Sequence, residues 1–213
     1  MLVSDIMATN VISIPSSTTL ADARRIMDAH GFFRLPIIDR GKLVGIITKF
    51  ALDRTGPSQL TTFNLHEISY LVNKITVKEV MRRDVVTVPP TMPVEEAAAI
   101  AQSKKVGALI AMEGERVVGI VTSSSFVRGI LIPILGIGLP GSRITVRDCH
   151  DGPNIEKVIS AINKMKVGIT NLFITDFPET KKHDLIIHLD TPDNSQVIKE
   201  ITKIGFKTED RPR

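Results

Sequence analysis

The sequence is short of cysteine and of aromatic residues. It has one cysteine, Cys149, no tryptophan and one tyrosine, and aromatic residues make up 4% of its 213 positions. A single cysteine excludes an intramolecular disulfide, and this usage is typical of cytosolic proteins. So few rings leave the core to aliphatic side chains and argue against the stacking used to bind single-stranded nucleic acid.

Long apolar runs and one-sided charge are also missing. The longest apolar run, residues 130–139, includes a proline and two glycines and is far shorter than the roughly 20 residues of a membrane-spanning helix. The formal net charge is +4, and the basic pairs Arg82-Arg83, Lys104-Lys105 and Lys181-Lys182 are interpreted as solvated surface. The chain opens as MLVSDIM, without a charged-then-apolar leader. We therefore expect a cytoplasmic protein that binds neither membrane nor nucleic acid.

The composition is that of a folded chain. Hydrophobic residues make up 43% and charged residues 23%, unlike the low-apolar, highly charged signature of disorder. At about 100–200 residues per domain, the length allows one or two ordinary domains or three small ones.

An internal repeat organises the N-terminal part. Residues 3–52 align without a gap with residues 77–126, a shift of 74 positions (77 − 3). The identical pairs are Val3/Val77, Met7/Met81, Val11/Val85, Pro15/Pro89, Ala23/Ala97, Ile26/Ile100, Leu35/Leu109, Val44/Val118, Gly45/Gly119, Ile46/Ile120 and Thr48/Thr122. This pattern indicates a tandem duplication, and because each copy is too small to bury a core alone, we expect the copies to pack together.

Each copy predicts the order β-α-β-β-α. A β-branched strand comes first, a helix opens near Thr19 or Pro93, two apolar strands follow across a glycine-containing turn, and a short helix begins after Thr48 or Thr122. The predicted strands are Val11–Ile14, RLPIID and LVGIIT in the first copy, and Val85–Val88, ALIAM and VVGIVT in the second.

This order, with DIM or EVM at the front and GIIT or GIVT closing the third strand, resembles the cystathionine-β-synthase (CBS) domain family from Met1 to about Gly129. The resemblance implies a noncatalytic pair that senses AMP, ADP, ATP or another adenosine compound in clefts between the copies. It divides the region into CBS domains at 1–56 and 75–132, joined by a linker at 57–74 that contains a helical stripe.

Residue types suggest which side chains form such a cleft. Thr48 and Thr122 stand where a strand ends and a helix begins, so each either caps the helix or also touches a ligand. Arg34 matches the place where the resemblance implies a phosphate contact. Apolar walls for a purine are expected from Ile12, Leu35, Pro36, Val86 and Leu109.

The sequence departs from the family motif Gly-h-h-Thr/Ser-x-x-Asp, whose aspartate binds ribose. That position is Ala51 in the first copy and Ser125 in the second. A hydrogen bond to a charged group is worth about 1.5–3 kcal/mol, so affinity falls about ten- to a hundredfold without it. We therefore expect the cleft that uses Thr122 and Ser125 to bind better.

After a hinge predicted at 133–142, residues 143–213 predict the order β-α-β-β-α-β. The linker motif Asn-Leu-His-Glu-Ile resembles that of acetoin-utilisation B-type proteins, which implies a ferredoxin-like ACT domain here. Asp151-Gly-Pro-Asn154 stands at the position of the ACT signature Asp-x-Pro-Gly, so Asp151 and Asn154 are candidate contacts for a small metabolite. The predicted fold class is thus α/β (α+β), with tandem CBS domains followed by an ACT domain.

The resemblance also implies a homodimer that acts on an unidentified regulated protein. No nucleophile, metal ligand set or carboxylate pair points to an enzyme, and no cofactor or metal is expected. Gly136–Gly141 spells GxGxxG but follows an apolar helix end rather than a strand, so it is interpreted as a hinge. An interaction scaffold with empty clefts remains the alternative to a nucleotide sensor.

Overall fold

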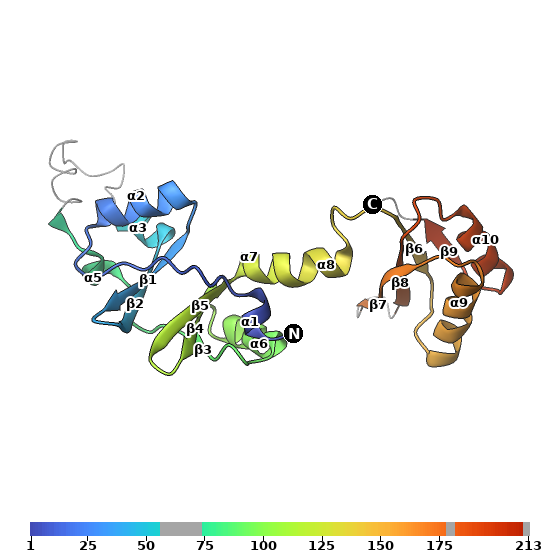
Figure 1. The fold of residues 1–213 in the computed structure, drawn as a ribbon, viewed down its shortest axis with the longest axis horizontal. Coiled ribbons are helices and arrows are strands. Elements are labelled where there is room, and N and C mark those ends of the chain that lie inside the picture. The colour runs from blue at the N-terminus through green and yellow to red at the C-terminus, as the bar shows by residue number, and fades with distance from the viewer. Residues whose placement is uncertain (56–73, 178–181, 211–213) are drawn as a thin grey trace. The chain divides into compact units, whose positions relative to one another are not determined.

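The computed structural model describes residues 1–55, 74–177 and 182–210, and the chain divides into two compact units, Met1–Gly129 and Ile130–Arg213 (Figure 1). Apart from Lys74, the linker predicted at 57–74 lies outside the described residues. The two units are described separately below.

Each repeat forms the helices and the hairpin that its sequence predicts. The hydroxyl of Thr19 accepts from the amide of Asp22 at 3.1 Å and so caps the first long helix. Arg40 and Gly41 have φ of 49° and 79°, as a type I′ hairpin turn requires. The first copy contains α1 (Val3–Ile6), α2 (Leu20–His30), β1 (Arg34–Asp39), β2 (Lys42–Thr48) and α3 (Lys49–Thr55). The second contains α5 (Val77–Val80), β3 (Thr87–Val88), α6 (Val94–Ser103), β4 (Ala108–Glu113), β5 (Arg116–Thr122) and α7 (Ser123–Phe126).

The opening strand of each copy is shorter than predicted. The first copy has only a single parallel bridge there, between Ile14 and Ile37, and the second has only β3. In both copies the next residue is a proline, which has no N–H and ends the ladder there. The predicted strand residues that do not pair, 11–13 and 85–86, all lie before this end. The strand predicted at Val11–Ile14 is therefore wrong, and the one at Val85–Val88 is too long.

The N-terminal segment of each copy is built into the other copy. The amide of Val3 donates to the carbonyl of Met92 at 2.9 Å, and the amide of Val77 donates to the carbonyl of Thr18 at 2.8 Å. These two bonds are equivalent under the 74-residue shift (3 + 74 = 77, 18 + 74 = 92). Each copy therefore gives its N-terminal segment to the other copy, in a reciprocal exchange.

The hydrophobic core of the first copy depends on this exchange. Val77 is fully buried and Met81 nearly so, and both come from the segment that opens the second copy. Burying one such side chain stabilises a fold by about 1.5–3 kcal/mol. The first copy supplies the rest of this core, which consists of Ile14, Leu20, Ala23, Met27, Leu35, Ile37, Ile47 and Leu52.

Two glycines make room for the exchanged methionines. A Cβ at Gly45 would lie 2.6 Å from Sδ of Met81 and 3.1 Å from the carbonyl oxygen of Arg82. A Cβ at Gly119 would overlap Sδ of Met7 and lie 2.8 Å from its Cγ. Each glycine therefore lets the other copy's segment lie directly on the strand.

A helical run leads out of the second copy. It continues from α7 through a π-helical turn (Val127–Leu131) to α8 (Ile132–Leu135) and ends at Gly136, whose φ is 59°. Residues 133–135 of the segment predicted as a hinge, 133–142, are therefore helical, and the hinge itself stays a prediction. Three left-handed glycines, Gly136, Gly138 and Gly141, follow. A strand rather than a helix comes after them, so the GxGxxG motif is not a dinucleotide-binding loop.

The C-terminal unit has the predicted β-α-β-β-α-β order. It contains β6 (Ser142–Val146), α9 (Gly152–Lys164), β7 (Ile169–Phe177), β8 (Lys182–Leu189), α10 (Ser195–Lys203) and β9 (Thr208–Asp210). The strands form one antiparallel sheet in the order β7-β8-β6-β9, which is the ferredoxin-like arrangement. Its core packs the sheet against both helices through Ile144, Val146, Cys149, Val158, Ile162, Leu185, Ile187, Leu189, Val197 and Ile201.

Asp151 begins α9 as its N-cap. One carboxylate oxygen accepts from the amide of Asn154 at 2.9 Å, and the other accepts from the Asn154 side chain at 2.6 Å. The bond from the backbone of Asn154 is the main cause that lowers the pKa of Asp151 below its ordinary value.

We expect Gly119→Ala to destabilise the N-terminal unit by about 1–3 kcal/mol, because the new methyl group overlaps Met7. Urea denaturation measures the change. Adding Met7→Ala should recover part of the loss, and Gly152→Ala, where a Cβ meets no atom within 4 Å, is the matched control. Equal losses in the single and double variants would contradict this account of the exchange.

We expect Asp151→Ala to destabilise the C-terminal unit, whereas Asp151→Asn keeps an oxygen acceptor for the cap. Because the folded-state pKa of Asp151 is lowered, its stabilisation is present above the unfolded pKa near 3.8 and is lost as pH falls through the folded pKa. Melting temperatures measured between about pH 2 and 5 should fall less steeply with acid in both variants than in the wild type. An unchanged slope would show that this carboxylate does not contribute.

Candidate functional site

A cavity of about 200 Å³ lies between the two repeats. The first copy lines it with Arg34, Ile46 and Thr48, from the ends of β1 and β2 (Figure 1). The second copy lines it with Arg82, Asp84, Val85, Val86, Lys105, Val106, Gly107 and Ala108. The cavity therefore exists only because the two copies pack together, and it contains three of the predicted site residues, Arg34, Thr48 and Val86.

The charged residues in the lining of this cavity are mostly cations. Arg34, Arg82 and Lys105 contribute three positive groups against one carboxylate, Asp84. Arg82 and Asp84 are 3.6 Å apart, and Asp84 is 89% exposed, so that pairing is weak. A concave surface with this charge suits an anion.

Arg34 crosses from the first copy to the second. Its guanidinium lies directly against Gly107, where a Cβ would overlap the terminal nitrogen. The absence of a side chain at Gly107 therefore gives Arg34 its place in the cavity.

A second cavity of about 210 Å³ lies within the second copy. It is mostly apolar and contains the predicted residues Leu109 and Thr122. It shares residues 106–108 with the first cavity, and its other lining residues are Ala98, Ala101, Val121, Ser123 and Phe126.

The threonines at the two strand ends act as helix caps. The hydroxyl of Thr48 accepts from the amide of Ala51 at 3.1 Å. In the second copy the amide of Thr122 donates to the hydroxyl of Ser125 at 3.1 Å, and Ser125 is only 8% exposed. Capping leaves the Thr48 O–H able to donate to a ligand. The Thr122 hydroxyl lies 3.4 Å from the Ser125 hydroxyl, and either of the two can be the donor.

Three of the predicted apolar walls do not line either cavity. Leu35 and Pro36 are buried, and Ile12 packs half-buried against the core of the first copy. Their predicted contact with a purine stays a prediction.

Two residues of the basic pairs also border the cavity. Arg82 and Lys105 are exposed, as the interpretation of solvated surface expects, and both line the cavity. The repeat alignment contained a signal, because Lys105 takes the place of Gly31 and Arg82 that of Ala8. The side chains of the Lys181-Lys182 pair lie outside the described part of the chain.

The C-terminal candidates have structural partners. Asp151 and Asn154 bind each other in the cap of α9. Cys149 is fully buried, and burial raises the pKa of its thiol, which disfavours a reactive thiolate. Within the described residues, no group of three or more His, Cys, Asp or Glu side chains could hold a metal ion, and no helix is long and apolar enough to cross a membrane.

Comparison with known proteins supports the repeat assignment. The CBS domain family matches residues 3–54 and 77–132. The uncharacterized protein MJ1225 of Methanocaldococcus jannaschii is 30% identical over 133 residues, which cover 60% of this chain and 46% of that protein. The chain thus spans less than half the length of this curated relative.

Two solved structures are similar to the chain. A crystal structure named as an acetoin utilization protein (AcuB) from Vibrio cholerae is 31% identical, with a TM-score of 0.53, and the match covers 64% of this chain and 94% of that one. The CBS domain pair of protein MJ0100, in complex with 5′-methylthioadenosine and S-adenosyl-L-methionine, is 32% identical, with a TM-score of 0.50, and the match covers 60% and 94%. Together with the two family matches, which span about half of the sequence, these findings show that the chain belongs to the CBS domain family.

Proposed function

We propose that the protein is a noncatalytic regulator that binds an adenosine compound of the AMP, ADP or ATP class between its CBS repeats. The observation that carries this proposal is the cavity between the repeats, where helix-capping Thr48, apolar Val86 and cations from both copies converge. The similar MJ0100 pair is in complex with two adenosine compounds.

The size of the cavities limits how such a ligand fits. Ligand pockets usually measure about 300–1,000 Å³, and each of the two cavities is smaller, at about 200 and 210 Å³. An adenosine compound is too large for either cavity alone. It would therefore extend past residues 106–108, which the two cavities share, or out into solvent. The apolar cavity beside Leu109 and Thr122 suits a purine, and the cationic one suits a phosphate.

An interaction scaffold with empty clefts is the second candidate. Ala51 has no polar side chain, and the Ser125 hydroxyl is buried against the amide of Thr122, so neither copy presents a carboxylate to ribose. Thermal-shift assays with AMP, ADP, ATP and adenosine separate the two functions. A ligand at 100 times its dissociation constant adds about 2.7 kcal/mol of stability, whereas a scaffold shows no shift.

We further propose that residues 143–213 form an ACT domain that dimerises the protein and that the glycine segment after α8 is a hinge. The β-α-β-β-α-β order and the antiparallel sheet support the first part. The three left-handed glycines support the second. Ligand binding would then change how the C-terminal units of the dimer act on a regulated protein.

We expect Ser125→Asp to tighten AMP binding about ten- to a hundredfold, because a carboxylate there can accept from ribose hydroxyls. It can also keep the bond from the Thr122 amide. Ala51→Asp is the matched change in the first copy, and we expect a smaller gain because Thr122 is part of the preferred site. Calorimetric titration measures both, and no gain in either folded variant would contradict the assignment.

We expect the full chain to be a dimer at micromolar concentration, because symmetric pairing closes by a twofold axis. Light scattering measures the mass against the 23.4 kDa of one chain. A monomer would refute the dimer without affecting the proposed ligand site.

A further inference from the structure

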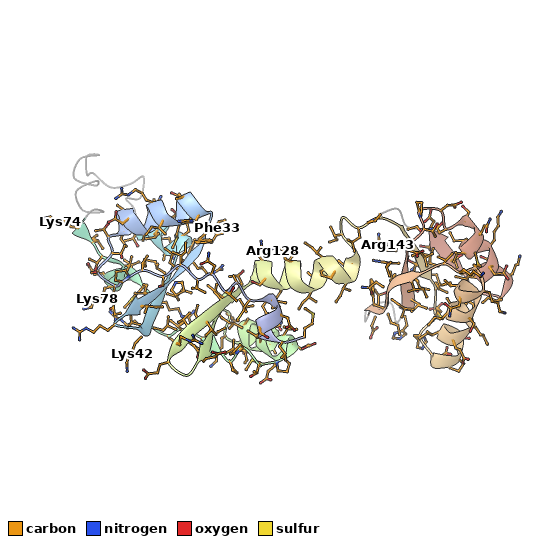
Figure 2. All side chains as sticks on the ribbon, in the orientation of Figure 1. Phe33, Lys42, Lys74, Lys78, Arg128 and Arg143 are labelled. Atoms are coloured by element: carbon orange, nitrogen blue, oxygen red, sulfur yellow. The ribbon has the colours of Figure 1, made fainter. Side chains whose placement is uncertain are left out.

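The C-terminal unit brings together two histidines that are 33 positions apart in the sequence (183 − 150 = 33). His150 lies in the loop between β6 and α9, and His183 lies near the start of β8 (Figure 1). The centres of their rings are 4.6 Å apart, and the ring planes are tilted by 39°. Val146 at the end of β6 pairs with Leu185 of β8, so His183 lies past that end of β6 and away from Arg143 at its start (Figure 2).

The sheet and its first helix hold the two rings in place. His183 stands two positions before the core residue Leu185, so it belongs to the face of the sheet that packs on the helices. The loop that carries His150 leads into α9 on this face. Cys149 before it is fully buried, and Asp151 after it caps α9. His150 is therefore fixed on both sides.

A carboxylate orients one of the two rings. Asp176 of β7 is the register partner of His183, and its Oδ1 lies 3.5 Å from Nδ1 of His183. A histidine that binds a metal ion through one ring nitrogen almost always directs the other at a carboxylate, a carbonyl or water. This pairing leaves Nε2 of His183 to bind an ion. The His183 side chain is 37% exposed, so an ion can reach it from solvent.

The distance between the rings fits one shared ion. When an ion lies about 2.0–2.1 Å from one nitrogen of each ring, the ring centres are roughly 4.5 Å apart for a right angle at the ion and roughly 5.2 Å apart for a tetrahedral angle. The observed 4.6 Å is close to the first value. Right angles between ligands are typical of Cu²⁺ and Ni²⁺.

We propose that His150 and His183 form an exchangeable site for a divalent transition ion, which binds Cu²⁺ most tightly and in which Asp176 orients His183. Two imidazoles are fewer than the three or four protein ligands of a resident zinc ion, and the described residues contain no larger ligand group. Water would complete the coordination, so the ion can leave. The site differs from the sequence-based expectation that no metal binds, and it does not depend on the proposed adenosine site.

Calorimetric titration of the full chain, prepared without a polyhistidine tag, tests the site with Cu²⁺, Zn²⁺ and Mg²⁺. We expect one Cu²⁺ per chain, weaker binding of Zn²⁺ and no binding of Mg²⁺. The reason is that nitrogen ligands bind copper most tightly of the divalent first-row ions, whereas magnesium prefers oxygen.

Three substitutions separate the roles of the residues. His150→Phe and His183→Phe keep a ring in place and remove one ligand each, so we expect each to lower the affinity for Cu²⁺ at least about tenfold. Asp176→Asn removes only the orienting charge and should lower it about tenfold. His30→Phe is the matched control, because the ring of His30 stacks on Phe32 in the N-terminal unit rather than on a second imidazole. It should keep the wild-type affinity.

The site would be overturned if the wild type bound no Cu²⁺, or if either His150→Phe or His183→Phe bound it as tightly as the wild type. An equal loss in His30→Phe would overturn it as well, since the binding would then not be specific to this pair. An unchanged affinity in Asp176→Asn would remove the orienting role of the carboxylate. None of these outcomes bears on adenosine binding, because both histidines lie in the C-terminal unit.

Discussion

The structure of the N-terminal unit depends on the reciprocal exchange between its two copies. Each opening segment leaves its own copy and closes the other, through equivalent backbone bonds at Val3 and Val77 and through methionines seated on Gly45 and Gly119. Neither core is complete without the partner copy, as Val77 and Met81 show for the first. The pair therefore folds as one cooperative body, although each copy is small enough to resemble a separate domain.

This constraint also explains where the site lies. The contact between the copies brings the ends of β1 and β2 against the segments that open β3 and β4, and the cavity lies at that junction. A ligand there would touch both copies at once. Its binding energy would act directly on the packing between the repeats.

Features set by local sequence were predictable, and features set by packing were not. The 74-residue repeat, the cap at Thr19 and the turn at Arg40-Gly41 depend on neighbouring residues, so they were visible in the sequence. The opening strand of the first copy was not, because its length depends on which carbonyls of β1 lie within reach. That Arg82 and Lys105 border a cavity was not visible either, because the cavity forms only where the two copies pack together.

The missing ribose carboxylate makes the cations of the cavity more important to the proposed ligand site. With Ala51 and Ser125 in place of aspartate, neither copy can offer ribose a charged acceptor, so a bound nucleotide must draw its affinity from its purine and its phosphate. Because Arg82 is 52% exposed, its contribution is weakened by solvent and salt. The proposed sensor would therefore bind a charged ligand with an affinity that falls as the ionic strength rises.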